Sequence, residues 1–192
     1  MAPWLVAGLG NPGDRYATSR HNLGRMVAEE IARDRAARFR KSRFLPVEVA
    51  EISTGSDRVL LARSTRYMNE SGPSYASLAR RSDVDAAHVV AVHDELDIPE
   101  GTLRIKAGGG NNGHNGLRSL QQALGTPEFL RVRVGIGRPP GRQDPADFVL
   151  EPVPKRLAPE VAIWVGRAAD AVVALIEDGL GSAQDRFNRS GP

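Results

Sequence analysis

The chain contains no cysteine among its 192 residues. This absence excludes disulfide bonds, thiolate nucleophiles and metal sites built from cysteine. It also fits a reducing compartment, so we expect a cytoplasmic protein. No segment approaches the run of about 20 apolar residues that a membrane-spanning helix needs, and residues 1–10 lack the basic start of a secretory signal.

The chain also has little net charge and few aromatic residues. The net charge is +3, and aromatic residues make up 5% of the chain. Such a charge suits an ordinary arginine-rich surface at least as well as a polyanion site, and the distinction depends on whether the arginines gather on one face. The length is sufficient for a core, so we expect one domain over residues 1–192 that needs no metal or disulfide for stability.

Hydrophobic periodicity alternates between strand and helix along the chain. Strands are predicted over Trp4–Leu9, Val47–Ile52, Arg58–Ala62, His88–His93, 102–106 and 131–137. Helices are predicted over 21–39, 71–81 (with Ser71 as its cap), 113–124 and 160–179, followed by a short one over 182–188. This alternation predicts a single compact α/β domain with helices on both faces of a twisted sheet, and the hairpin over residues 44–62 makes that sheet mixed.

A G-x-G-x-x-G pattern follows the first predicted strand, at residues 8–13. In a dinucleotide-binding oxidoreductase the third glycine lies in the helix that receives the pyrophosphate, and an acidic residue ends the next strand. Here Pro12 precedes the third glycine, the helical stripe begins only near Asn22, and that acidic residue is missing. A tight turn that places Asn11 at the carboxyl edge of the strand is the better interpretation.

Polar side chains gather where predicted strands end or helices begin. They are His21, Asn22, Asn69, Asp94, His114 and Asn115. Each taken singly is readily explained as a helix cap, a turn cap or a solvated side chain. Together they suggest a histidine held by an aspartate and acting as general base on water, with asparagine amides stabilising an oxyanion.

Two further patterns bear on the site. The four histidines show neither H-x-x-x-H nor H-E-x-x-H spacing, so we expect no metal site and no cofactor. The glycine- and asparagine-rich residues 108–116 cannot form a regular element. They predict either a mobile lid over a site or a flexible surface connection.

Several motifs together resemble those of one family. In chain order they are "GLGNPGDRYATSRHNLG", "YMNESG", "HDELDIPEGTLRIKAGGG", "GHNGLRSL", "RVRVGIGRP" and "DFVL", with "DGLGSAQDRFN" near the end. The combination resembles bacterial-type peptidyl-tRNA hydrolase from residue 5 to about residue 150 and again near the end. The resemblance implies a compact monomer that binds peptidyl-tRNA and cleaves the ester between the peptide and the 3′-terminal ribose, recycling tRNA from stalled translation.

The resemblance also implies roles for individual residues. His21 matches the catalytic base, Asp94 its orienting carboxylate, and the asparagines that hold water, substrate and the tetrahedral intermediate are Asn11, Asn69 and Asn115. Residues matched to tRNA or substrate binding are Tyr16, Tyr67, Asn69, Lys106, His114, Asn115 and Arg133. Residues 108–117 match a gate loop over the peptide channel.

This sequence departs from the family pattern at three places. Ser19 replaces a threonine, Tyr67 replaces a phenylalanine, and Asn111 and Asn112 replace histidine and glycine in the gate loop. The loop change bears on loop flexibility and not on the base. A non-hydrolytic RNA-binding relative is the alternative within the family, and the retained His21 and asparagines argue against it.

The two basic residues matched to tRNA binding lie on predicted strands. Period-2 alternation puts Arg133 on the face opposite Val132 and Val134, and it puts Arg104 and Lys106 on one face. If the two strands are neighbours, Lys106 and Arg133 can meet one phosphate. The alternative is that both are solvated and paired with nearby acids, which contributes little.

Overall fold

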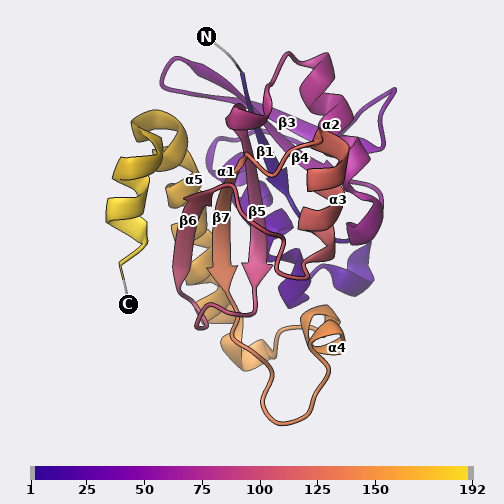
Figure 1. Ribbon diagram of the computed structural model, residues 1–192, viewed down its shortest axis with the longest axis vertical. Helices are drawn as coiled ribbons and strands as arrows, with labels where there is room; N and C mark the ends of the chain where they lie inside the picture. The colour runs from indigo at the N-terminus through magenta and orange to yellow at the C-terminus, as the bar shows by residue number, and fades with distance from the viewer. Residues whose placement is uncertain (1–2, 190–192) are drawn as a thin grey trace.

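The computed structural model describes residues 3–189, which fold around one mixed sheet of seven strands (Figure 1). The strands are β1 (Trp4–Gly8), β2 (Arg40–Lys41), β3 (Val47–Thr54), β4 (Asp57–Ser64), β5 (Val89–Glu95), β6 (Leu103–Ala107) and β7 (Leu130–Gly135). Their order is β2-β3-β4-β1-β5-β7-β6. β4, β1, β5 and β7 are parallel, whereas β3 and β6 run antiparallel to their neighbours, so the predicted mixed sheet is confirmed.

Helices cover both faces of this sheet, as predicted. They are α1 (Leu23–Asp34), α2 (Gly72–Arg81), α3 (Asn115–Leu124), α4 (Pro145–Leu150) and α5 (Ala158–Phe187). Alternate residues of the strands point to opposite faces. Val6 and Val90 join a core with α1 and α5, whereas Leu5 and Val89 join a second core with α2 and α3. Both cores are apolar and continuous, which fixes the strand register.

The carboxyl ends of the central strands face one end of the molecule. The chain leaves β1 toward β2–β4 on one side, and later enters β5 on the other side of β1. Open α/β sheets place ligand crevices at such a point, because the loops diverge there. In Figure 1 the arrowheads of β5 and β7 point toward α4, which lies beyond this end of the sheet.

The glycines of residues 8–13 serve packing. A Cβ on Gly8 would lie 2.7 Å from the Cβ of Ala28, and one on Gly10 would lie 2.8 Å from the Cβ of Arg25. Both glycines therefore let α1 lie directly against the end of β1. Gly13 has a φ of 92° in an open turn, and α1 begins ten residues later, at Leu23.

Several element boundaries differ from the prediction. The helix predicted over 21–39 is a 3₁₀ turn at Arg20–Asn22 followed by α1, which ends at Asp34 because Ala36 has a φ of 52°. The helix predicted to end at Gly179 does break there, with a φ of 83°, and it continues as a short helical segment to Phe187.

Other differences concern caps and missed elements. Ser71 does not cap α2 with its side chain, because its hydroxyl donates to the carbonyl of Met68 at 2.8 Å. The two-residue β2 and the six-residue α4 were not predicted. Within residues 3–189, no helix is both long and apolar enough to cross a bilayer.

Candidate active site

His21 and Asp94 form a buried pair at the carboxyl end of the central strands. His21 lies in the 3₁₀ turn before α1, and Asp94 lies near the end of β5. The Nδ1 atom of His21 is 3.0 Å from each carboxylate oxygen of Asp94. Nδ1 therefore carries the hydrogen and donates it to the carboxylate. Nε2 has no hydrogen-bond partner among residues 3–189 and keeps its lone pair.

Burial and charge shift the pKa values of His21 and Asp94 in opposite directions. Burial alone would lower the pKa of His21, but the charge of Asp94 and its hydrogen bond raise that pKa above its ordinary value. Burial alone would raise the pKa of Asp94, but His21 and His114 hold it well below its usual range. Asp94 thus stays a carboxylate and fixes the ring of His21.

His114 is the second histidine that contacts Asp94. Its Nδ1 accepts hydrogen bonds from the backbone amides of Gly116 and Leu117, at 3.1 and 3.3 Å, and so caps α3. The ring hydrogen must then sit on Nε2, which donates to Asp94 Oδ1 at 2.9 Å. Both nitrogens of His114 are occupied, whereas His21 has one nitrogen free for a proton.

His93 lies behind His114 and has no exposed surface. The two rings pack edge to face with centroids 4.9 Å apart. Burial is the main cause that lowers the pKa of His93 well below its ordinary value. His93 therefore supports the ring of His114 from behind and lines neither of the two cavities of the site.

A pair of asparagines holds the turn after β1. Asn22 accepts from the backbone amide of Asn11 at 2.8 Å and donates to its carbonyl at 2.9 Å. The side-chain oxygen of Asn11 accepts from the amide of Met68 at 2.7 Å. This leaves the NH₂ group of Asn11 without a partner among the described residues, next to the turn that carries Asn69.

Asn11, Asn69 and Asn115 come together with His21 around one cavity of about 550 Å³. Tyr16 and Tyr67 line the same cavity, their rings in edge-to-face contact with centroids 6.4 Å apart. The capping roles considered for two of the asparagines are wrong: His114 caps α3, and Asn69 lies in the 3₁₀ turn that precedes α2.

A second cavity, of about 340 Å³, lies on the other side of His21. Its walls include Asp94, His114 and the gate loop. Asn112 of that loop donates to Glu95 at 2.8 Å and to Asp97 at 2.5 Å. The predicted loop over residues 108–116 is thus tied to the end of β5 by a residue that departs from the family pattern.

Lys106 and Arg133 lie on neighbouring strands, away from both cavities. β6 pairs antiparallel with β7, which sets Arg104 opposite Arg133 and Lys106 opposite Arg131. The period-2 pattern predicted that each strand keeps its two basic residues on one face, and the pairing of the strands brings all four onto the same face. After burial, the charges of Arg133 and Arg131 lower the pKa of Lys106, because like charges crowd it.

Arg131 is fully buried. Its guanidinium donates to the carbonyls of Gly109, Gly110 and Pro127, and it stacks on Phe129 at 4.6 Å. This arginine therefore anchors the start of the gate loop to the sheet.

His21, Asp94 and His114 also bring three possible metal-ligating atoms within 4.8 Å of one another. Sequence spacing did not reveal this cluster, because its members come from three separate segments: the 3₁₀ turn before α1, the end of β5 and the start of α3. In the structure these atoms are joined directly by hydrogen bonds of 2.9–3.0 Å.

Some residues of the site were missed from sequence. Asn22 was not identified as the clamp on Asn11, and Arg20, which stacks on Phe148 at 4.0 Å, was not identified as the contact to α4. Ala146, Val149 and Leu150 of α4 line the larger cavity. The signal for α4 was present, because Asp144 followed by Pro145 is a common helix start, and Asp144 does accept from the amide of Ala146.

Comparison with known proteins identifies the family of the chain. The family model described as peptidyl-tRNA hydrolase matches residues 5–192. The chain belongs to the peptidyl-tRNA hydrolase family. The chain is 50% identical to a peptidyl-tRNA hydrolase of Frankia alni, across 97% of this chain and 94% of the relative. Its identity to one from Kineococcus radiotolerans is 49%, across 96% of each chain.

A solved structure agrees with the sequence comparison. The crystal structure of peptidyl-tRNA hydrolase from Acinetobacter baumannii superimposes on this structure with a TM-score of 0.91 at 30% identity, covering 99% of this chain and 96% of that one. The family and the fold implied by the sequence motifs are therefore confirmed.

Proposed function

We propose that this protein hydrolyses the ester bond between a peptide, or an N-blocked aminoacyl group, and the 3′-terminal ribose of tRNA. The observation that carries the proposal is the ring of His21. Its Nδ1 is held by Asp94, and it lines the cavity that also contains Asn11, Asn69 and Asn115. This arrangement supplies a base and amide donors without a covalent nucleophile.

The proposed reaction begins with a water molecule at Nε2 of His21. His21 takes a proton from this water as the oxygen attacks the ester carbonyl, and Asp94 stabilises the imidazolium that forms. The tetrahedral intermediate then breaks its bond to the ribose oxygen. That oxygen takes the proton from His21 and leaves as the 3′-hydroxyl, and the peptide leaves with a free carboxyl group.

The proposed role of the asparagines is to stabilise negative charge with neutral amide groups. Asn69 and Asn115 have exposed amide groups that make no hydrogen bond to another described residue. Such amides are able to donate to the oxyanion or to the peptide backbone. Because backbone groups are the same in every peptide, this cavity would accept many sequences, with Tyr16 and Tyr67 as its apolar wall.

Contact with the tRNA is assigned to the basic face of β6 and β7. Lys106 and Arg133 share that face, and they are close enough for the positive charge of Arg133 to lower the pKa of Lys106. A phosphate between them would relieve this repulsion. His114 completes the substrate-facing residues, lining the smaller cavity.

The proposed substrate and site also bear on the compartment and the oligomeric state of the protein. Peptidyl-tRNA arises in translation, so we place the protein in the cytoplasm. All members of the proposed site come from one chain, so we propose that it acts as a monomer. The alternative of a non-hydrolytic RNA-binding relative is disfavoured because the His21–Asp94 pair is fully assembled.

The experiment is to incubate the purified protein with an N-acetyl-aminoacyl-tRNA labelled in the amino acid. The proposal predicts release of labelled N-acetyl-amino acid together with intact tRNA that can be charged again. Nucleolytic damage to the tRNA, or binding without release of label, would support a different function for the fold.

A further inference from the structure

One surface outside the site concentrates positive charge. Residues 38–43 contain four basic side chains and no acidic one. They include β2, at the edge of the sheet opposite β6. We use the name Phe44 patch for the exposed residues Arg40, Lys41, Arg43, Phe44, Arg66 and Arg81.

Phe44 is the most exposed large apolar side chain of the described residues, at 72%. The Cζ atoms of Arg43 and Arg81 lie 5.8 and 5.4 Å from the centre of its ring. Two cations therefore flank an aromatic ring that faces solvent. A single exposed apolar side chain is common by itself, and the two flanking guanidinium groups are what distinguish Phe44.

The cations of the Phe44 patch have no carboxylate partner among residues 3–189. Some exposed arginines elsewhere are paired, since Arg33 contacts Glu30, Arg58 contacts Glu51, and Arg138 contacts Asp97. The Phe44 patch instead gathers several unpaired cations around one exposed aromatic ring. A polyanion is the ligand that such a surface attracts.

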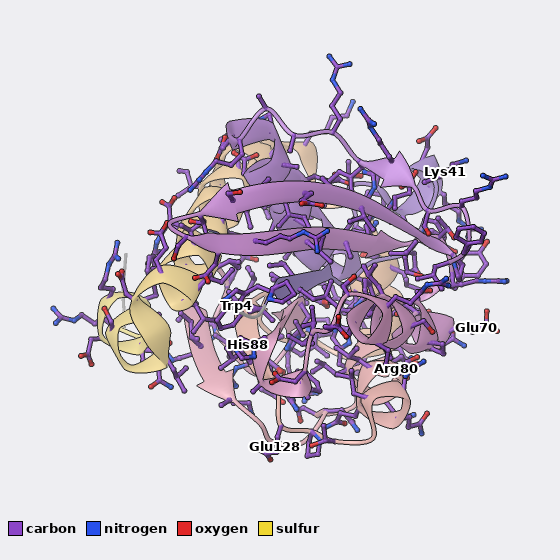
Figure 2. All side chains as sticks on the ribbon, turned by 90° about the horizontal axis from the view of Figure 1, so that it is seen from above. Trp4, Lys41, Glu70, Arg80, His88 and Glu128 are labelled. Carbon is purple, nitrogen blue, oxygen red and sulfur yellow. The ribbon has the colours of Figure 1, made fainter. Side chains whose placement is uncertain are left out.

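The turn that carries Phe44 is ordered and close to the site. The hydroxyl of Ser42 accepts from the amides of Phe44 and Leu45, and the carbonyl of Pro46 accepts from the amide of Thr65 at 3.0 Å. Arg66 follows directly and precedes Tyr67 of the larger cavity. Figure 2 shows Lys41 and Arg80 on the same side of the molecule as Glu70 of the turn that carries Asn69.

We propose that the Phe44 patch binds an unpaired RNA strand, with Phe44 stacked on a base and the surrounding cations on the phosphates. A flanked aromatic ring suits an unpaired strand, because the bases of a duplex hide their faces from a protein surface. Six inter-strand steps of about 4.8 Å, or roughly 29 Å, separate β2 from β6. The patch is therefore a second RNA contact, beyond the one proposed for Lys106 and Arg133.

The test uses a fluorescently labelled 12-nucleotide oligouridylate and measures its affinity by anisotropy between 50 and 200 mM salt. The variant K41A/R43A removes two cations of the patch. K155A/R156A is the matched control, because it removes the same charge from exposed residues elsewhere. Phe44→Ala is compared with Phe44→Tyr, which keeps a ring, and with Ile163→Ala, another large exposed apolar side chain.

We expect K41A/R43A to reduce the slope of log affinity against log salt by about 1.4, that is about 0.7 for each lost phosphate contact on a single strand. Phe44→Ala should weaken binding roughly 5-fold or more, and Phe44→Tyr should restore it. The control variants should bind as the wild type does. Hydrolysis of a short aminoacyl-nucleotide should stay unchanged in every variant, because none of these residues lies in the proposed site.

Three results would overturn the proposal. The first is no binding of oligouridylate to the wild type at 50 mM salt. The second is an equal loss in K41A/R43A and K155A/R156A, which would mean that only net charge matters and that the cations merely protect a sheet edge. The third is unchanged RNA binding in K41A/R43A with loss of binding to vesicles of anionic phospholipid, which would assign the patch to a membrane surface. Failure of hydrolysis in the wild type would count against the proposed function alone.

Discussion

At the scale of single residues, the hydrogen bonds of the two histidines in the site show which of them can act as a base. Both contact the carboxylate of Asp94, yet only His21 has a ring nitrogen free of partners among residues 3–189. The sequence named His21 as the base and His114 as a substrate-binding residue, but it could not show the hydrogen bonds that separate the two. The distinction depends on the amides of Gly116 and Leu117, which meet His114 only once α3 has formed.

Asp94→Asn should lower turnover and move the acid limb of the rate profile to lower pH. The base works as neutral imidazole, so the rate rises with pH through the pKa of His21. The carboxylate raises that pKa, and its loss should lower it. The measurement is kcat/KM against pH for both proteins on a short aminoacyl-nucleotide. An unmoved limb would show that Asp94 has only a structural role.

Chelation should leave activity unchanged. In the cluster of His21, Asp94 and His114, both histidines already hydrogen-bond to the carboxylate of Asp94 at 2.9–3.0 Å. We expect the same rate before and after dialysis against EDTA. The short substrate is needed here, because magnesium also stabilises tRNA itself. A loss of rate that zinc or magnesium restores would require a metal in the mechanism.

At the scale of elements, the gate loop illustrates what sequence showed and what it missed. Its irregular composition predicted a loop, and the structure has one. The sequence did not show which residues hold the loop, because Asp97 comes from the β5–β6 connection and Arg131 comes from β7. Periodicity likewise gave most strands and helices, but it missed α4, whose six residues are too few to show a helical period.

Asn112→Gly should loosen this loop. Asn112 has a φ of 48°, which glycine adopts without strain, so the variant removes the hydrogen bonds to Glu95 and Asp97 and little else. Amide hydrogen exchange in residues 108–114 should become roughly 3- to 10-fold faster.

The matched control for the loop is Asp83→Gly, since Asp83 is also exposed and has a φ of 55°. It should leave exchange in residues 108–114 as in the wild type. If Asn112→Gly does the same, Asn112 does not hold the loop, and Arg131 is the remaining anchor to examine.

At the scale of the whole molecule, the sheet holds the proposed catalytic pair and the basic surfaces at different positions. The His21–Asp94 pair lies at the carboxyl ends of the central strands, and basic residues lie at both edges. The sequence predicted the mixed sheet and the helices on both faces, because its alternating pattern is strong. It could not predict that β6 and β7 pair, because pairing partners are not encoded in a local period.

Lys106→Ala and Arg133→Ala should weaken binding of full-length peptidyl-tRNA. Each lost contact with the duplex stem should reduce the slope of log affinity against log salt by about 0.9. Hydrolysis of a short aminoacyl-nucleotide, which lacks the stem, should barely change. K155A/R156A serves as the control for net charge. Equal damage to long and short substrates would mean that these residues support the site or the fold instead.

The most direct test of the account is His21→Ala, assayed in single turnover on N-acetyl-aminoacyl-tRNA, with tRNA affinity and melting temperature measured on the same sample. Loss of the general base predicts a rate roughly 10²- to 10⁴-fold lower, with affinity and melting temperature close to those of the wild type. A variant that folds, binds tRNA and hydrolyses the ester at the wild-type rate would contradict the assignment of His21 as the base.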